Sequence, residues 1–149
     1  MNGYYRTTER LRDLLQADPD INTVTKGARE EIDNYKATMF PIAHISVEPS
    51  RFTNNTITFS FTVHALDIRD IDKTPKLDKF LGNDNEDDNL NAMFYVLVRL
   101  YLQLRKFGDD IDIINDMNPE PVTYQFKNLL DGWRCIFEME IPIDEVTAC

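Results

Sequence analysis

The stretch 88–107 constrains the fold most, because it joins helical periodicity to an unusually wide apolar surface. One side carries apolar residues at the i, i+3, i+4, i+7 spacing of a core-facing helix: Leu90, Met93, Leu97, Leu100, Tyr101 and Leu104. A surface helix needs an apolar stripe of only about 100°. Here Phe94, Val96, Val98 and Leu102 widen it. We therefore expect one flank of this helix to pack on a sheet and the other on a second surface.

Two kinds of surface fit the second flank. A neighbouring subunit would make Val98 and Leu102 subunit contacts, whereas loops of the same chain would bury them internally. The ends of the helix are marked by Asp87, Asp88 and Asn89, which are candidate N-caps, and by Gly108, which is placed to end it.

Strict alternation of apolar and polar residues predicts two long strands. Ile42–Glu48 alternates through Ala43, Ile45 and Val47, and Thr56–Ile68 alternates over five apolar positions from Ile57 to Ala65. We expect one face of these strands to be buried and the other to be wet. After Ala65 the apolar parity shifts to Leu66 and Ile68, which suggests a bulge.

The segments before these strands are shorter. Residues 4–15 predict a first helix that Pro19 ends, and 21–25 predict an edge strand. Residues 28–40 are weakly patterned and indicate a long excursion, and 70–86 form a charged loop.

The end of the chain predicts a hairpin. A brief strand is expected near Ile111–Ile114, followed by two alternating strands with Asp131-Gly132 as the tight turn between them. Pro142 ends the pairing, and 143–149 form a loose tail. The order of elements predicts a single α+β domain over 1–149, with an antiparallel sheet of about four to five strands and two helices packed on one face.

The charge of the chain is acidic and uneven. The formal net charge is −10, and residues 76–149 contribute −8 of it, from 7 Lys/Arg against 15 Asp/Glu. Binding of nucleic acid depends largely on Lys and Arg that neutralise phosphates, so specific DNA or RNA binding is not expected. No apolar run approaches the ~20 residues that span a bilayer, and the two cysteines do not suggest a disulfide framework.

Residues for catalysis or metal binding are not grouped in a recognisable motif. His44 and His64 lie on the polar parity of adjacent strands, where we expect them to be solvated, and a metal would need three or four ligands. The acidic run 83–88 lacks the calcium-loop pattern. We find no nucleophile motif, phosphate-binding glycine loop or dinucleotide fingerprint. The sequence therefore predicts no enzyme, no cofactor and no metal.

Several stretches resemble the tail-terminator and tail-completion proteins of tailed bacteriophages. These are the opening YYRTTERLRDLL with INTVT, the phrase MFPIAHISVEPSRFTNNTITFSFTVHALDIRD, and the helix after an acidic loop. The closing PEPVTYQFKNLLDGWRCIFEMEIPID is similar to the end of virion proteins from phages of Bacteroidetes hosts, including crAss-like phages.

The resemblance implies a virion structural protein that forms a ring, six-fold or twelve-fold, at the neck or the top of the tail. Such a ring acts as a tail terminator or head-tail connector and contacts other neck, portal-side or tail-tube proteins. DNA passes through its lumen without specific binding. The expected location is the virion, and the host cytoplasm during assembly, with no membrane. The alternative is a bacterial adaptor or small-ligand-binding module with a pocket between sheet and helix.

Two acidic stretches are candidates for the DNA channel of such a ring. Carboxylates facing the lumen would repel phosphates and let a duplex slide. The alternative is that both stretches are solvated outer loops whose charge serves solubility. The candidate residues are Asp84, Glu86, Asp87, Asp88, Asp109, Asp110, Asp112 and Asp116.

Overall fold

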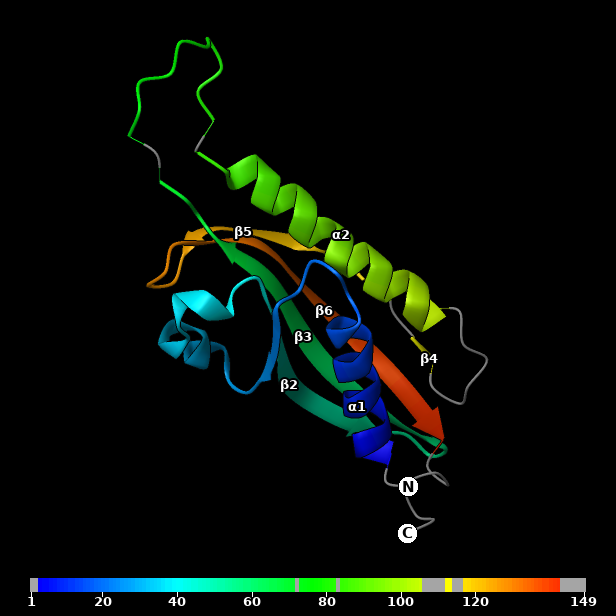
Figure 1. Cartoon of the computed structure of the whole chain (residues 1–149). Coiled ribbons are helices and arrows are strands. Elements are labelled where there is room, and N and C mark those ends of the chain that lie inside the picture. The colour runs from blue at the N-terminus through cyan, green and yellow to red at the C-terminus, as the bar shows by residue number, and fades with distance from the viewer. Residues whose placement is uncertain (1–2, 72, 83, 106–111, 114–116, 143–149) are drawn as a thin grey trace.

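The computed structural model describes residues 3–71, 73–82, 84–105, 112–113 and 117–142 (Figure 1). Within them, the chain forms one sheet of six strands with two α-helices on one face. The helices are α1 (Gly3–Gln16) and α2 (Glu86–Arg105), and short 3-10 helices occupy η1 (Arg29–Asn34) and η2 (Ala37–Met39). The strands are β1 (Thr23–Lys26), β2 (Ile42–Phe52), β3 (Thr56–Ile68), β4 (Asp112–Ile113), β5 (Glu120–Gln125) and β6 (Leu130–Pro142).

The strand order is β1-β2-β3-β6-β4, and β5 pairs with the other end of β6. The pairings of β2, β3, β4, β5 and β6 with one another are antiparallel, as expected for this α+β fold. β1 differs, because it runs parallel to β2. The excursion 28–40 explains this: it folds into η1 and η2 and carries the chain back across the sheet before β2 begins.

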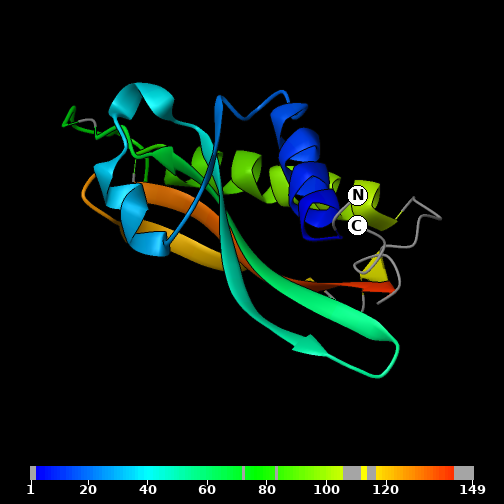
Figure 2. The same cartoon turned by 90° about the horizontal axis from the view of Figure 1, so that it is seen from below.

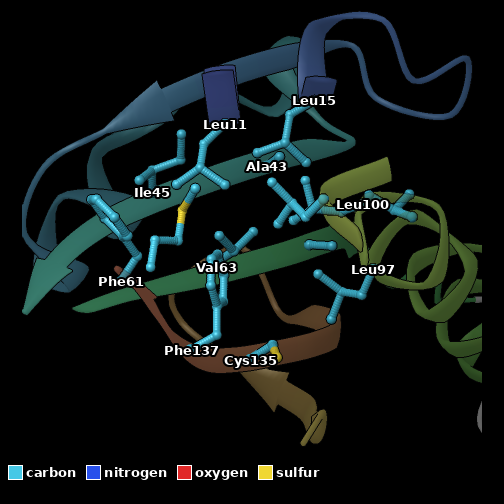
Figure 3. Packing of buried hydrophobic residues seen from close by; sticks show 14 of the residues in the cluster. Leu11, Leu15, Ala43, Ile45, Phe61, Val63, Leu97, Leu100, Cys135 and Phe137 are labelled. Carbon is cyan, nitrogen blue, oxygen red and sulfur yellow. The ribbon is translucent and has the colours of Figure 1, made fainter. Parts of the chain in front are cut away.

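The main core lies between the sheet and the two α-helices. Leu11 and Leu15 of α1 face Leu97 and Leu100 of α2 across the apolar side chains of the central strands (Figure 3). The alternate residues Cys135, Phe137, Met139 and Ile141 of β6 belong to this cluster, and Trp133 packs against it. At the edge of the helical layer, Arg99 of α2 binds both carboxylate oxygens of Asp18 at 2.8 Å and so ties α2 to the end of α1.

α2 begins slightly earlier than expected, at Glu86. Asp87 and Asp88 therefore lie inside its first turn instead of capping it, where they still complement the helix dipole. Asn89 is buried and donates its amide to the Ile68 carbonyl at 3.0 Å. Gly108, the expected end of the helix, lies outside the described residues.

The second face of the sheet is not uniformly wet, which corrects the sequence-based expectation. At one end a second hydrophobic cluster joins Ile42, Leu66, Val122 and Leu130 to Ile32 and Phe40 of the η1–η2 segment. Next to it His44 and His64 are register partners and are buried, with rings 6.4 Å apart. Toward the β2–β3 hairpin, this face lies beyond the second cluster formed by the described residues.

The second cluster also explains the change of parity at Leu66. β3 pairs with β6 in continuous register from Thr56 to Ile68, so the expected bulge after Ala65 is wrong. Leu66 is apolar because the second face is covered at that point. The irregularity lies instead in β2, between Glu48 and Arg51.

The closing hairpin is correct but its predicted turn is wrong. Asp131 and Gly132 are residues of β6, paired with Asp67 and Leu66 of β3, and Gly132 does not have a positive φ. The chain turns at Phe126–Leu129, where these two residues have φ of 66° and 54°. The long pairing with β3 draws Asp131-Gly132 into the strand and leaves the turn to the preceding residues. β6 ends at Pro142 as expected, and the predicted tail 143–149 is outside the described residues.

Gly132 should nevertheless be essential for stability, for a reason other than a turn. An added Cβ would overlap the carbonyl oxygen of Ala65 on β3 and lie 3.0 Å from the Cα of Leu66. We expect Gly132→Ala to lower the free energy of unfolding by about 2 kcal/mol or more. Gly82→Ala is the matched control, because its Cβ would meet only the exposed Phe80 ring. Equal urea midpoints for the two variants would contradict this packing.

Candidate functional site

A projecting loop at residues 73–82, here called the arm, is the most prominent candidate for an interaction site. It extends beyond the start of α2, away from the sheet (Figure 1). Phe80 and Leu81 are 69% and 73% exposed, and Leu77 is fully exposed. Sequence reasoning missed these residues because it treated the stretch as a charged loop. The available signal was three large apolar residues in a loop that also contains Pro75 and Gly82.

Hydrogen bonds close the base of the arm. The Asn85 side-chain oxygen accepts the Asp70 amide at 2.7 Å, and its Nδ2 donates to the Ile68 carbonyl at 3.3 Å. Asn89 donates to the same carbonyl. The strand that leads into the arm and the helix that follows it are therefore joined directly beneath it.

A buried ion pair strengthens the same region. Arg69 forms two hydrogen bonds of 2.8 Å to the Asp131 carboxylate, which is fully buried and also accepts the Tyr124 amide at 2.8 Å. The guanidinium lies over the Tyr124 ring and 3.4 Å from Glu86. Arg69 thus links the end of β3, the closing hairpin and the start of α2.

The acidic candidates that the structure describes lie in two places. Asp84, Glu86, Asp87 and Asp88 gather at the base of the arm and the start of α2, where Glu86 is close to Arg69. Asp109, Asp110 and Asp116 lie outside the described residues, and only the backbone of Asp112, in β4, is described. β4 lies near the other end of α2 (Figure 1). A helix of 20 residues is about 30 Å long, so the backbone of Asp112 is well separated from residues 84–88.

The outer flank of α2 carries the predicted contact residues. Leu102 is 46% exposed and Val98 is half-buried. Tyr95 is exposed one turn earlier and completes an i, i+3, i+7 stripe with them. The chain's own described residues thus leave this flank partly uncovered.

The two histidines form a buried polar pair on the second face. His44 Nε2 lies 3.1 Å from the carbonyls of Gly27 and Ala28, which only accept, so this nitrogen carries a proton. Nδ1 lies 2.7 Å from the Thr25 hydroxyl, which donates to it in the neutral ring. Burial lowers the pKa of His44. Burial, followed by the charges of His44, Arg29 and Arg134, lowers the pKa of His64 to about 4.

The hollows and the possible metal ligands bear on whether the chain binds a small molecule or a metal. No group of three His, Cys, Asp or Glu side chains among the described residues is arranged to hold a metal ion. The hollow between α1 and β1 encloses about 210 Å³, less than the ~300 Å³ of a typical ligand pocket. A larger hollow of about 460 Å³, beside β2, is lined by residues 26–30 and 46–48 and is open. In the part of the chain that is described, no helix is long and apolar enough to cross a membrane.

Comparison with known proteins leaves the family open. No protein-family model matches the chain, and no curated protein sequence is significantly similar to it.

The buried histidines predict a specific dependence of stability on pH. Because the pKa of His64 is lower in the folded state than when unfolded, its neutral form stabilises fully above about pH 6.5, and this stability is lost as pH falls toward about 4. Between these two pH values we expect the free energy of unfolding of His64→Gln to fall less than that of the wild type. The difference between the two decreases should reach up to about 3 kcal/mol. Measurements at pH 8 give the packing cost alone. Parallel pH profiles for variant and wild type would contradict the prediction.

The ion pair predicts a contrast between buried and exposed carboxylates. Asp131→Asn leaves Arg69 without its buried counter-charge and should cost about 3 kcal/mol of unfolding free energy. Glu120→Gln removes the partner of Arg134 in an exposed pair and should cost less than about 1 kcal/mol. Urea denaturation of both variants measures the difference, and similar losses would show that Arg69–Asp131 is not a structural link.

Proposed function

We propose that this protein is a structural subunit of a bacteriophage virion that assembles into a ring at the neck or the top of the tail. The observation that carries the proposal is the exposed apolar surface of the arm, at Leu77, Phe80 and Leu81. A loop whose base is held by hydrogen bonds and whose apolar side chains are exposed at its tip is suited to contact another protein chain. The resemblance of the sequence to tail-terminator and tail-completion proteins supplies the biological setting.

Two further features support a subunit role. The stripe of Tyr95, Val98 and Leu102 on α2 offers a second surface, distant from the tip of the arm. A subunit in a closed ring needs two different surfaces, because each copy contacts one neighbour on either side. The acidic chain would also let DNA pass through a lumen, since carboxylates do not bind phosphate.

The alternative, an adaptor or ligand-binding module, has weaker support. Its pocket was expected between sheet and helix, where the hollow beside α1 is small. Native mass spectrometry of the purified chain would reveal a retained metabolite, which would favour this alternative.

The proposed location can be tested in purified phage particles. We expect mass spectrometry to detect the chain in intact virions, and gold-labelled antibody to mark the neck or the upper end of the tail. Microscopy of the isolated assembly should show a ring of six or twelve copies. Absence of the chain from intact particles would refute the proposal.

The role of the acidic residues near α2 can be tested separately. We choose Asp87→Lys with Asp88→Lys, because both side chains are exposed, and leave Glu86 in place because it contacts Arg69. If they face the lumen, particles with this variant should eject DNA more slowly than wild type, most clearly at low salt. Asp13→Lys with Glu30→Lys changes the same charge at exposed positions elsewhere. Equal ejection rates for both variants would assign Asp87 and Asp88 to an outer surface.

A further inference from the structure

Among the described residues, the β2–β3 hairpin end of the second face of the sheet lies beyond the second hydrophobic cluster. In this region Ser46, Thr58 and Thr62 are buried, whereas the other side chains are partly or fully exposed. Three residues from each of β2, β3 and β6 form this region, and the strand register places them side by side. We call it the open face, and it consists of Ser46, Glu48 and Arg51 on β2, Thr58, Ser60 and Thr62 on β3, and Ile136, Glu138 and Glu140 on β6. In Figure 2 this hairpin extends away from α1 and α2. The η1–η2 segment covers only the other end of the face.

Two properties indicate that the open face is suited to contact a protein. Ile136 is 55% exposed, in the part of β6 between its pairing with β5, which reaches Arg134, and its pairing with β4, at Met139 and Glu140. The open hollow beside β2 borders Ser46 and Glu48 and enlarges the surface.

We propose that the arm of one copy of this chain docks on the open face of a second copy. This inference rests on the ring function proposed above and names the partner of the arm. The arm holds Lys73, Lys76 and Lys79 against Asp78, a charge of +2 in a chain of −10. The open face holds three glutamates against Arg51, a charge of −2. Arg51 forms an ion pair with Glu138 at 2.8 Å, so Glu48 and Glu140 carry this net charge. Opposite charges therefore meet when the two surfaces are brought together.

The apolar parts of the two surfaces also match. Leu77, Phe80 and Leu81 lie between and beside the arm lysines, so the arm presents apolar and basic groups together. The open face presents Ile136 among Glu48, Glu138 and Glu140. Docking would remove exposed apolar area from water on both copies, and the lysine ammonium groups would supply donors for the glutamates.

The positions of the two surfaces determine the type of assembly. The arm leaves the sheet where β3 ends at Ile68, and the open face lies toward the opposite end of β3 (Figure 1). Contact of different surfaces on neighbouring copies is heterologous, and it closes into a ring when the rotation between copies permits. A ring of this kind repeats one arm-to-face contact around its circumference.

Charge reversal on the full-length chain tests the contact. Lys76→Glu with Lys79→Glu reverses two exposed arm charges, and Lys36→Glu with Lys127→Glu is a control of equal charge change at exposed positions outside the arm. Sedimentation velocity over a range of concentrations measures the apparent dissociation constant of the assembly. We expect the arm variant to raise it by at least about tenfold and the control to leave it nearly unchanged.

A compensating pair gives the decisive result. Glu48→Lys with Glu140→Lys should weaken assembly alone, and the four substitutions in one chain should restore it. A mixture of the arm variant and the face variant should also assemble when the two variants alternate. The acidic arm of the first then meets the basic face of the second, and the basic arm of the second meets the acidic face of the first. Circular dichroism and thermal unfolding of each variant confirm that it is folded.

The outcomes separate this inference from the proposed function. The arm-to-face contact would be overturned if the arm variant assembled as tightly as wild type. It would also be overturned if the variant with all four substitutions failed to recover assembly. Either result would leave the ring function standing. A wild-type chain that stays monomeric at every concentration would also overturn the arm-to-face contact. Absence of the chain from virions would refute the proposed function independently.

Discussion

The pairing of β3 with β2 and β6 is the constraint on which the rest of the structure depends. All thirteen residues of β3 pair with β6 without a register shift. Because side chains alternate along this continuous central strand, one face of the sheet packs against α1 and α2. The other face packs at one end against the η1–η2 segment. Both the arm and the open face are positioned by this strand, since the arm follows its last residue and the open face includes its early residues.

The main elements could be predicted because their sequence periods match one buried surface. The alternation of Ile57, Phe59, Phe61, Val63 and Ala65 and the helical spacing of Met93, Leu97, Leu100 and Leu104 each indicate where one core lies. The second core could not be predicted in the same way. Leu66 was interpreted as evidence of a bulge because alternation alone does not reveal that both faces of a strand are covered at one end. The histidines were misplaced for the same reason.

The turn of the closing hairpin shows how long-range pairing can override a local signal. Asp-Gly is a favourable turn pair, but here Asp131 binds Arg69 and Gly132 lies close to the backbone of β3. Both residues are needed in the strand for contacts with residues more than sixty positions away. Leu129 instead has a positive φ, which costs conformational energy for a residue with a side chain. The candidate site was predicted in part for a similar reason. Val98 and Leu102 were identified from the helical period of the sequence, whereas the exposure of the arm is apparent only from the folded structure.

The arm combines a base fixed by hydrogen bonds with an exposed tip, and this combination is suited to specific association without non-specific aggregation. Binding by a segment that must first become ordered loses free energy, so a base already fixed by Asn85, Asn89 and Arg69 lowers that cost. At the tip, Lys79 separates Leu77 from Phe80 and Leu81 in the sequence. The net negative charge of the chain repels other copies at long range. Attraction then requires that the basic tip reach an acidic surface at short range, within about 8 Å at physiological salt. Such an arrangement favours one defined contact over general self-association.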